Sequence, residues 1–549
     1  MWNHHARRST FFLLGTLLFS GLAPAAPIRV LVLTGQNNHA WQETTQSIQR
    51  ILDENGRFAT TVTEHPESMT PEQLAQFDVI VSNWNAWGDA PVKDWSQPAR
   101  DALLAFVRSG KGFVSVHAGT SSFYDWPEYQ ELAITSWKLG ETGHGKRHRF
   151  NVKPIDQTHP ITQGVLPFMT HDELWHKAPI QPGATVLATA YSSVDQGGSG
   201  DEEEMLVVRP FGDGRAVNLL LGHDATAMET PSFGMLLARS VEWAATGVVT
   251  TPARTVSWEH TSDALTLSMN GEVLWTLHFG ASASKPFFHP LALPGGPTLT
   301  WDAPPDHVWH HGLWFSWKSL NGVNFWEENP STGRADGITA WEPPEIASAD
   351  DGSARVKFAV LYELADGTRL IDEERSLVIS APDNAGNYFI DWTSVFKATS
   401  GDVKLDRTPI LGEPDGQTWG GYAGLSLRFA PMSEPQYFTE NGPVEVSENR
   451  AHVDAEALSY SGVIERKNCG IAMLQYPGNP LSPVPWYVIS NPPNSFYFFS
   501  PTVLYRAPRT LTAAAPMTLH YRVYVHSGHW DSKELQKHLA ELNVSPKEQ

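Results

Sequence analysis

Histidines follow three of the apolar, strand-like runs in the first half of the chain. They are His39, His117 and His223, and a fourth, His144, lies between the last two. Imidazole accepts a proton near neutral pH and is a common ligand of divalent metals. Histidines gathered at one edge of a sheet would therefore support either proton transfer or the binding of a metal ion.

Carboxylates accompany these histidines. Asp172-Glu173 follows another histidine, and Asp224 follows His223. A carboxylate can hold an imidazole in one tautomer, or it can complete a nitrogen and oxygen site that suits Zn or Mn. The same side chains could equally bind sugar hydroxyl groups without a metal, and the sequence leaves both alternatives open. We expect the catalytic residues to be His117, Glu173, His223 and Asp224.

Asparagines and tryptophans follow the strand-like run 77–82. Amide groups hydrogen bond to hydroxyls, and indole rings offer apolar faces on which a sugar ring can stack. We therefore expect a carbohydrate substrate, and we expect no nucleotide cofactor. The expected substrate-binding residues of this half are His39, Trp41, Asn83, Trp84, Asn85, Trp87, His144 and Asp172.

The elements that must position these residues alternate between strand and helix. Residues 28–33, 77–82, 112–117 and 216–221 are predicted strands, and residues 41–55, 97–109 and 232–245 are predicted helices. This alternation predicts a mostly parallel sheet with helices on both faces. Ligands of such sheets bind beyond the carboxyl ends of the strands, where the polar loops would meet.

His117 occupies the turn after the strand 112–116, where other α/β enzymes place a serine or cysteine nucleophile. The domain contains no cysteine, which excludes a thiol-dependent glutamine amidotransferase. We hypothesise that His117 is a general base that removes a proton next to a sugar carbonyl. The N-terminus of a following helix would keep this imidazole neutral. A packed, hydrogen-bonded histidine is the alternative.

Short motifs occur throughout the first half of the chain. They are Leu33-Thr34-Gly35, His39-Ala40-Trp41, Gly110-Lys111-Gly112, His117-Ala118-Gly119, Trp126-Pro127-Glu128-Tyr129, Gly143-His144-Gly145, His159-Pro160-Ile161-Thr162, His171-Asp172-Glu173-Leu174-Trp175 and Gly222-His223-Asp224. With these motifs, roughly residues 28–246 resemble the ThuA family of trehalose-utilisation proteins. The resemblance implies a flavodoxin-like fold of the class I glutamine amidotransferase type and a role in sugar catabolism, on keto derivatives of glycosides.

The second half of the chain consists of short alternating runs separated by Pro, Gly, Asn and Asp. This pattern predicts an antiparallel β-sandwich over residues 255–526, closed by a helix at 532–542. The densest cluster of histidines and tryptophans in this half lies at residues 306–317 and predicts either a metal site or a sugar-binding pocket. The expected metal ligands are His289, His307, His310 and His311, and the expected substrate-binding residues are Trp309, Trp314, Trp317 and Tyr422.

The second half contains the motifs His289-Pro290, Asp306-His307, His310-His311-Gly312-Leu313-Trp314 and Gly421-Tyr422-Ala423-Gly424-Leu425. With these motifs, roughly residues 265–525 resemble the domain family called PmoA-like, whose function is unsettled. The family label suggests methane oxygenation. We reject that activity because a methane monooxygenase subunit of this kind is a membrane protein, and the sequence contains no spanning segment.

The N-terminus has the three parts of an export signal: Arg7-Arg8, an apolar stretch at 11–22 and small residues at 23–26. We expect a soluble periplasmic or secreted protein without membrane insertion. The expected boundaries are a signal peptide at 1–26, a ThuA-like domain at 27–248, a linker at 249–258, a PmoA-like β domain at 259–526, and a C-terminal helix and tail at 527–549.

Composition narrows the possible partners. The chain has 60 acidic and 39 basic side chains and a formal net charge of −21, which argues against a nucleic-acid partner. The single cysteine, Cys469, excludes intrachain disulfides and thiolate metal clusters, so any metal site must use His, Asp and Glu. The sequence does not define the oligomeric state.

Two functions are compatible with these patterns. The first is an exported enzyme that processes glycosides or keto-glycosides by lyase, hydrolase or isomerase chemistry. The alternative is a non-catalytic carbohydrate-binding protein. A binding protein needs only aromatic and amide groups, whereas an enzyme also needs titratable groups that converge. The position of His117 and the cluster at 307–311 favour the enzyme.

Overall fold

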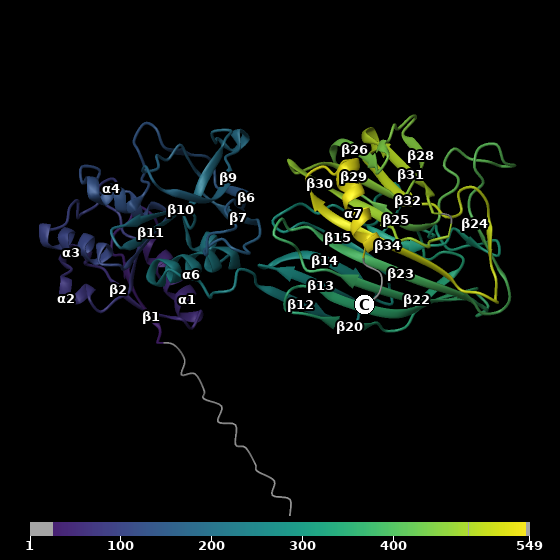
Figure 1. Cartoon of the computed structure of the whole chain (residues 1–549), viewed down its shortest axis with the longest axis horizontal. Helices are drawn as coiled ribbons and strands as arrows, with labels where there is room; N and C mark the ends of the chain where they lie inside the picture. Colours follow the sequence, from purple (N-terminus) through teal and green to yellow (C-terminus); the bar gives the residue numbers. More distant parts are fainter. Residues whose placement is uncertain (1–25, 481, 545–549) are drawn as a thin grey trace, which may run out of the picture.

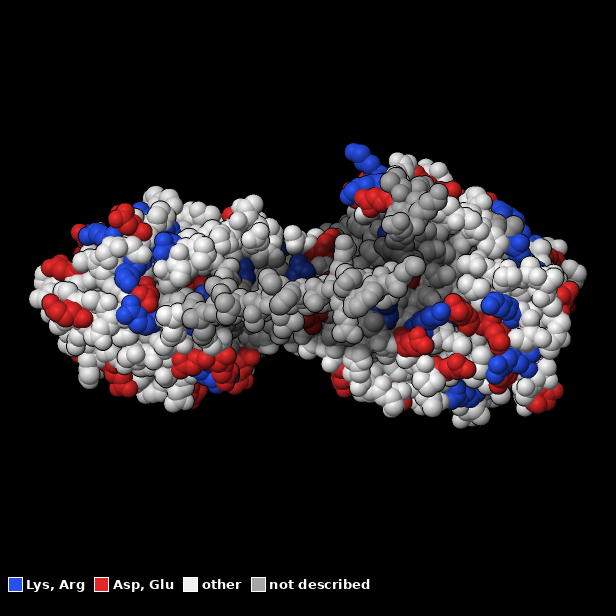
Figure 2. All heavy atoms as spheres, turned by 60° about the horizontal axis from the view of Figure 1, so that its bottom comes forward, with Lys and Arg blue, Asp and Glu red and all other residues white. Residues whose placement is uncertain are grey.

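The structure, a computed structural model, describes residues 26–480 and 482–544, and these form two lobes (Figure 1). The expected signal peptide lies outside the described residues except for Ala26. Acidic and basic side chains are interspersed over both lobes on the face shown in Figure 2. None of the described helices is both long and apolar enough to cross a bilayer.

The N-terminal lobe is built on one nine-stranded sheet with the order β2-β1-β3-β4-β11-β10-β9-β6-β7. Its first five strands are parallel, as the sequence predicts, and the last four extend the sheet with antiparallel pairs. The strands are β1 (Ile28–Leu33), β2 (Phe58–Thr63), β3 (Val79–Ser82), β4 (Gly112–Val116), β6 (His148–Pro154), β7 (Phe168–Asp172), β9 (Thr185–Tyr191), β10 (Glu202–Phe211) and β11 (Gly214–Leu219).

Helices cover both faces of this sheet because its central strands are apolar on both sides. On β1, Val30 and Val32 contact one hydrophobic core, and Leu31 and Leu33 contact the other. The helices are α1 (Trp41–Glu54), α2 (Pro71–Leu74), α3 (Gln97–Arg108), α4 (Pro127–Ala133), α5 (Ala225–Met228) and α6 (Pro231–Thr246). A small separate ribbon pairs β5 (Gly143–His144) with β8 (Trp175–His176).

Local sequence signals set the ends of the longer helices. The Ser96 hydroxyl accepts a hydrogen bond from the backbone N–H of Ala99 at the start of α3. Thr230 caps α6 in the same way, with Pro231 as the first helical residue. Gly247 ends α6 in the left-handed conformation, with φ of 79°, which glycine adopts without steric cost.

The C-terminal lobe is a β-sandwich, which agrees with the predicted fold class. One sheet has the order β12-β13-β14-β15-β16-β25-β32-β31-β28, and the facing sheet has the order β19-β21-β22-β23-β34-β30-β29-β26-β27, with β20 paired to β21. A third sheet, β18-β17-β24-β33, lies at one end. Trp275, Trp317 and Trp392 are buried in the core between the two large sheets.

The paired strands of this lobe are antiparallel, and their lengths range from 2 to 11 residues. They are β12 (Val256–His260), β13 (Ala264–Met269), β14 (Glu272–His278), β15 (Phe287–Leu291), β16 (Leu313–Ser316), β17 (Ser319–Leu320), β18 (Val323–Asn324), β19 (Ile338–Trp341), β20 (Glu345–Ser348), β21 (Ala354–Glu363), β22 (Arg369–Ile379), β23 (Tyr388–Ala398), β24 (Val403–Asp406), β25 (Gly424–Arg428), β26 (Ser433–Thr439), β27 (Gly442–Pro443), β28 (Arg450–Ala455), β29 (Ala457–Ile464), β30 (Lys467–Gln475), β31 (Val484–Asn491), β32 (Phe496–Pro501), β33 (Arg509–Leu511) and β34 (Met517–Ser527).

The last helix, α7 (Ser532–Val544), is part of this lobe. Leu535 and Leu539 of α7 pack with Ala457, Leu474 and Tyr524 on the outer face of the second sheet. The expected separate C-terminal unit is therefore an integral layer of the β domain, lying over β34 and β30 in Figure 1.

The connection between the lobes is shorter than the expected linker at 249–258. Strand β12 already begins at Val256, where it pairs with Met269 of β13. Between the lobes, the Arg254 guanidinium donates to the carbonyl oxygens of Gly164 at 2.9 Å and Pro382 at 2.7 Å. This residue therefore joins the two domains and is not an unstructured spacer.

Candidate functional site

Four expected residues converge at the carboxyl edge of the parallel strands. His39 follows β1, His117 follows β4, Glu173 follows β7 and His223 follows β11. Each offers one ligand atom, and these four atoms all lie within 4.8 Å of one another. Among the described residues, this is the one group of histidines and carboxylates close enough together to hold a metal ion.

Hydrogen bonds orient two of these imidazoles. Nδ1 of His117 donates to the carbonyl oxygen of Leu220 at 2.8 Å, and Nδ1 of His39 donates to Oδ1 of Asn37 at 3.0 Å. Both rings therefore keep Nε2 as a lone-pair donor. Nε2 of His117 is buried and has no hydrogen-bond partner among the described residues. Metal-binding histidines typically show this arrangement, with the distal nitrogen bonded to a backbone or amide oxygen.

Glu173 lies at the centre of the cluster. Its Oε1 accepts a hydrogen bond from the indole of Trp175 at 3.1 Å and lies 3.6 Å from Nε2 of His117. Its Oε2 lies 3.3 Å from Nδ1 of His144 and 3.6 Å from Nε2 of His223. Burial raises the pKa of Glu173, but the surrounding imidazoles outweigh burial and lower it to about 2. The carboxylate is therefore ionised at any physiological pH.

The histidines divide by their pKa. Burial, reinforced by the neighbouring imidazoles, lowers the pKa of His39 to about 3 and that of His223 to about 4. Burial also lowers the pKa of His117, but the carboxylates of Glu173 and Asp172 outweigh it and raise this pKa above its ordinary value. Two neutral imidazoles thus lie beside His117 and the ionised carboxylate of Glu173, and the negative charge that favours a proton on His117 would equally favour a bound cation.

The expected helix behind His117 is not formed. His117 has φ of 46°, as a strained elbow requires, but it is followed by a 3₁₀ turn over His117–Thr120 and no α-helix. A turn of four residues has no developed dipole, so the argument that a helix N-terminus keeps His117 neutral is wrong. The fully buried His117 also lies beneath the pocket above the cluster and is not among the residues that line it.

Asp172 and Asp224 position the loop of His223 and do not face a substrate. The buried Asp172 carboxylate accepts hydrogen bonds from the backbone N–H groups of Gly222 at 2.7 Å and His223 at 3.1 Å. Asp224 caps α5 by accepting from the N–H of Ala227 at 2.9 Å and forms an ion pair with Arg147. The expected contact of Asp172 with substrate is therefore corrected to a supporting role.

Three other expected binding residues belong to the protein interior. Asn83 donates to the hydroxyls of Thr44 and Thr45, both at 3.0 Å. Asn85 is fully buried and ties the loop of Asn37 to the carbonyl of Ala118, while Trp84 stacks on Phe123 in the core. Trp41 begins α1 and does not line the pocket. The side-chain types of Asn83, Trp84 and Asn85 did not reveal that the loop after β3 turns toward the protein interior.

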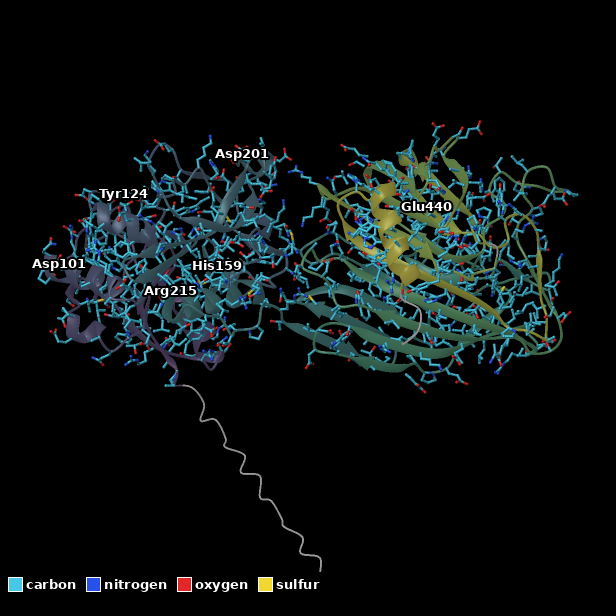
Figure 3. The ribbon with its side chains drawn as sticks, viewed as in Figure 1. Asp101, Tyr124, His159, Asp201, Arg215 and Glu440 are labelled. Carbon is cyan, nitrogen blue, oxygen red and sulfur yellow. The ribbon has the colours of Figure 1, made fainter. Side chains whose placement is uncertain are left out.

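A pocket of about 140 Å³ opens above the cluster. Trp87 and His144 line it as expected, and Tyr124 lies beside Trp87 at the upper side of the lobe in Figure 3. Trp137 and Trp175 form further aromatic walls that the sequence prediction missed, although Trp175 lies within one of the ThuA motifs. The lining residues are Asn38, His39, Trp87, Ala118, Ser121, Trp137, His144, Glu173 and Trp175.

The four histidines expected to bind metal in the β domain do not meet. His307 and His310 stack at a ring distance of 4.7 Å. His311 instead lies between Asp302, 2.7 Å away, and Glu328, 3.0 Å away, while Nδ1 of His289 bonds to Thr300 at 2.9 Å. The predicted metal site is therefore wrong, because consecutive residues entering a strand point to opposite sides.

His307 and His310 do line a second pocket, of about 300 Å³, on the outer face of the first sheet. Trp309 and Tyr422 line it as expected. Trp314 is fully buried beneath His310, at a ring distance of 4.9 Å, and Trp317 is fully buried in the sandwich core. These two tryptophans are therefore structural, which corrects the expectation that they bind substrate.

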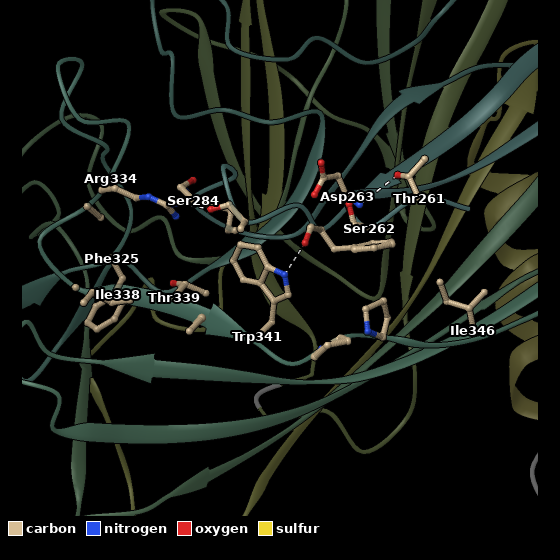
Figure 4. A pocket seen from close by; sticks show the side chains of 18 of the residues that line it. Thr261, Ser262, Asp263, Ser284, Phe325, Arg334, Ile338, Thr339, Trp341 and Ile346 are labelled. Carbon is tan, nitrogen blue, oxygen red and sulfur yellow. Dashed lines mark hydrogen bonds between the residues drawn. The ribbon is translucent and has the colours of Figure 1, made fainter. Parts of the chain in front are cut away.

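A larger pocket of about 810 Å³ lies at one edge of the sandwich (Figure 4). Trp341, whose indole donates to the carbonyl of Phe279 at 2.7 Å, forms one wall. Its two cationic side chains are already engaged: Lys285 forms an ion pair with Glu328 at 2.6 Å, and Arg334 donates to backbone carbonyls. The pocket therefore offers mainly apolar surface with no unengaged cation among the described residues, and its remaining titratable side chains are His260 and Asp263.

Both domains match known families. Residues 29–244 match the ThuA family, described as trehalose utilisation, and residues 264–540 match a family of unknown function, DUF6807. The predicted order, a ThuA domain followed by a domain of unsettled function, is confirmed. The description of the second family carries no PmoA-like label. No curated protein matches the chain.

Three solved structures are similar to parts of the chain. A putative ThuA-like protein from Parabacteroides merdae is 30% identical, covering 41% of this chain and 92% of that chain with a TM-score of 0.37. A glutamine amidotransferase from Thermotoga maritima is 12% identical, covering 39% and 96% with a TM-score of 0.25. A β-galactosidase from Rahnella sp. R3 is 13% identical, covering 50% and 39% with a TM-score of 0.29.

Proposed function

We propose that this chain, which belongs to the DUF6807 family and carries a ThuA domain N-terminal to its DUF6807 domain, is an enzyme. It acts on a carbonyl-bearing sugar, such as a keto-glycoside, and uses a divalent metal ion bound in the ThuA domain. The observation that carries the proposal is the convergence of His39, His117, His223 and Glu173. The strongest part of this observation is Nε2 of His117, which is buried and forms no hydrogen bond within the described residues, since an unsatisfied buried nitrogen is costly unless a ligand completes it.

The donor set suits Zn or Mn. Three imidazole nitrogens and one carboxylate form a mixed nitrogen and oxygen set, which these ions accept. When bound, such an ion polarises a carbonyl oxygen and stabilises the negative charge that develops on it. Asn37 and the carbonyl of Leu220 would hold two of the ligand rings in place.

The pocket residues support binding of a sugar ring. Trp87, Trp137 and Trp175 offer indole faces, while Asn38 and Ser121 offer hydrogen-bonding groups. This mixture of apolar walls and few polar groups is typical of small-molecule sites. The name of the ThuA family, trehalose utilisation, points to the same class of substrate.

His144 is the residue best placed to accept a proton in this pocket. Its side chain is 44% exposed, and its Nδ1 donates to the carbonyl of Gly145 at 2.9 Å, which leaves Nε2 free as a base. We therefore assign proton abstraction next to the carbonyl to His144, and we assign His117 to metal binding. Removal of that proton permits elimination, isomerisation or loss of the glycosidic group.

The alternative, a non-catalytic carbohydrate-binding protein, explains the aromatic walls but not the cluster beneath them. A binding site has no need of three imidazoles and an ionised carboxylate directed at one point. We also propose that the protein is exported, because residues 1–26 have the pattern of an export signal. Its substrate would then be a sugar in the periplasm or outside the cell.

Incubation of the purified protein with oxidised and unoxidised disaccharides, with and without a chelator, followed by mass spectrometry, tests the proposal. We expect conversion of the oxidised sugars only, with loss of conversion on chelation and recovery on addition of Zn²⁺ or Mn²⁺. Binding of sugars without any conversion in the metal-loaded protein would favour the non-catalytic alternative.

A further inference from the structure

We infer that the DUF6807 domain carries a second, independent site, in which the 300 Å³ pocket binds one pyranose ring and His307 accepts a hydrogen bond from a sugar hydroxyl. This site shares no residue with the proposed metal site of the ThuA domain. Three features carry the inference: the aromatic walls, an oriented imidazole, and a deep histidine without a hydrogen-bond partner among the described residues.

Aromatic side chains from separate segments form the walls. Trp309 precedes β16, Trp326 follows β18, Tyr422 precedes β25 and Phe496 begins β32. The rings of Trp326 and Tyr422 lie 5.0 Å apart at an angle of 52°, so they form a corner and do not stack face to face. Rings brought together from distant parts of the chain and left facing a cavity are typical of sites for flat apolar ligand faces, such as those of a pyranose.

His307 is oriented by a chain of charged hydrogen bonds. Its Nδ1 donates to Oδ2 of Asp306 at 2.9 Å, and Oδ1 of Asp306 accepts from the buried guanidinium of Arg428 at 2.9 Å. The Arg428 guanidinium also lies 4.0 Å from the ring centre of Phe496. This chain of hydrogen bonds fixes the tautomer of His307 with a proton on Nδ1, so Nε2 is the acceptor that we assign to the sugar hydroxyl.

His310 supports the assignment at the base of the pocket. Its side chain is 4% exposed and forms no hydrogen bond within the described residues, and its Nδ1 is buried without a partner there. Burial lowers the pKa of His310 well below its ordinary value, so the ring is neutral. The other ring nitrogen, Nε2, also forms no hydrogen bond within the described residues but is not enclosed in this way, so it is the atom of His310 that a ligand or water in the pocket could reach.

The charges of the pocket favour a neutral sugar over an organic cation. Aromatic cages for quaternary ammonium groups need negative charge or exposed ring faces without competing cations. Here Glu327 is already matched by Lys318 at 2.5 Å and accepts from the hydroxyl of Tyr422 at 2.7 Å. Arg450, which donates to the hydroxyl of Tyr487 at 3.1 Å, adds a cation to the lining. The volume suits one ring and is too small for a polymer.

The test is calorimetric titration of the full-length protein with D-glucose, D-galactose, D-mannose and choline, after treatment with EDTA. We expect at least one hexose to bind with a stoichiometry of one. Its affinity should be at least tenfold weaker for Trp309→Ala and for His307→Ala. His307→Gln keeps a hydrogen-bond acceptor and should recover part of the lost affinity. Val273→Ala, at an exposed position of β14 that does not line the pocket, is the control and should bind as wild type.

Three results would overturn the inference: no hexose binding at about 20 mM sugar, binding that is unchanged in both pocket variants, or choline bound in preference to every hexose. Circular dichroism and thermal unfolding of each variant establish that the fold is retained. Because metal has been removed, failure of the proposed metal-dependent function leaves this result intact, and the reverse also holds.

Discussion

The hydrogen bond from Nδ1 of His117 to the carbonyl oxygen of Leu220 joins the ends of two neighbouring parallel strands, β4 and β11, at 2.8 Å. It turns Nε2 of His117 toward Glu173, 3.6 Å away. The elbow after β4, with φ of 46°, and the backbone after β11 together direct this nitrogen into the cluster. The ring is therefore positioned by the sheet itself, which suits a fixed ligand better than a mobile proton acceptor.

Removal of one ligand should abolish tight metal binding. In His39→Ala and His223→Ala we expect the affinity for Zn²⁺ to fall at least about 100-fold, because a three-ligand site remains where four converged. Elemental analysis after dialysis and competition with a chromogenic chelator measure the change. His171→Ala removes an exposed histidine beside the site and should leave one ion bound per chain. Equal metal content in all three variants would refute the cluster as a metal site.

Asn37 should tune the same site without touching the ion. Its Oδ1 accepts the proton of His39 Nδ1 at 3.0 Å, so Asn37→Ala frees the ring to rotate and should weaken metal binding about 10–100-fold. Asn37→Asp keeps an acceptor at this position and should restore most of the affinity. If the alanine and aspartate variants bind Zn²⁺ equally, the orientation of His39 does not depend on this bond.

The parts of the site that depend on strand order could be predicted from the sequence alone. Parallel strands place their carboxyl ends at one edge, so the pattern of strands and loops was sufficient to group His39, His117 and His223. The same reasoning failed for Asn83, Trp84 and Asn85, because side-chain type does not tell whether a loop turns toward solvent or toward the interior.

In the β domain, too, the sequence predicted the side of the strand but not the contacts of each side chain. Alternation along a strand places His310 and His311 on opposite sides, and the two rings have different neighbours: His310 packs on Trp314, and His311 lies against Phe287. What that pattern could not provide was the partner of each ring, since Glu328, which lies beside His311, comes from another segment. Long-range contacts of this kind decide whether a histidine is a ligand or a packed side chain.

Turnover measurements should distinguish the role of His144 as a proton acceptor from the role of His117 as a metal ligand. We expect His144→Ala to lose about 10²–10⁴-fold in kcat on an oxidised disaccharide while still binding one Zn²⁺, because only the proton acceptor is removed. His117→Ala should lose turnover together with metal affinity. Single-turnover kinetics on metal-loaded protein, with metal content measured in the same samples, check both. Full activity in His144→Ala would return the role of base to another residue of the cluster.

Acid should weaken the β domain through His526, and this effect can be isolated. His526 is fully buried against Trp530, at a ring distance of 4.1 Å, and burial lowers its pKa to about 3. The unfolded chain takes up a proton near pH 6.5 and the folded chain does not, so stability is lost as the pH falls below about 6.5. With these two pKa values the loss between about pH 7 and pH 5 is about 2 kcal/mol. His526→Phe keeps an aromatic ring over Trp530. In this variant we expect the free energy of unfolding, measured in urea, to change by about 2 kcal/mol less between pH 7 and pH 5 than in the wild type. His171→Phe, at an exposed position, is the control and should match the wild type. An unchanged pH dependence in His526→Phe would mean that this imidazole is protonated, or accessible to protons, in the folded protein.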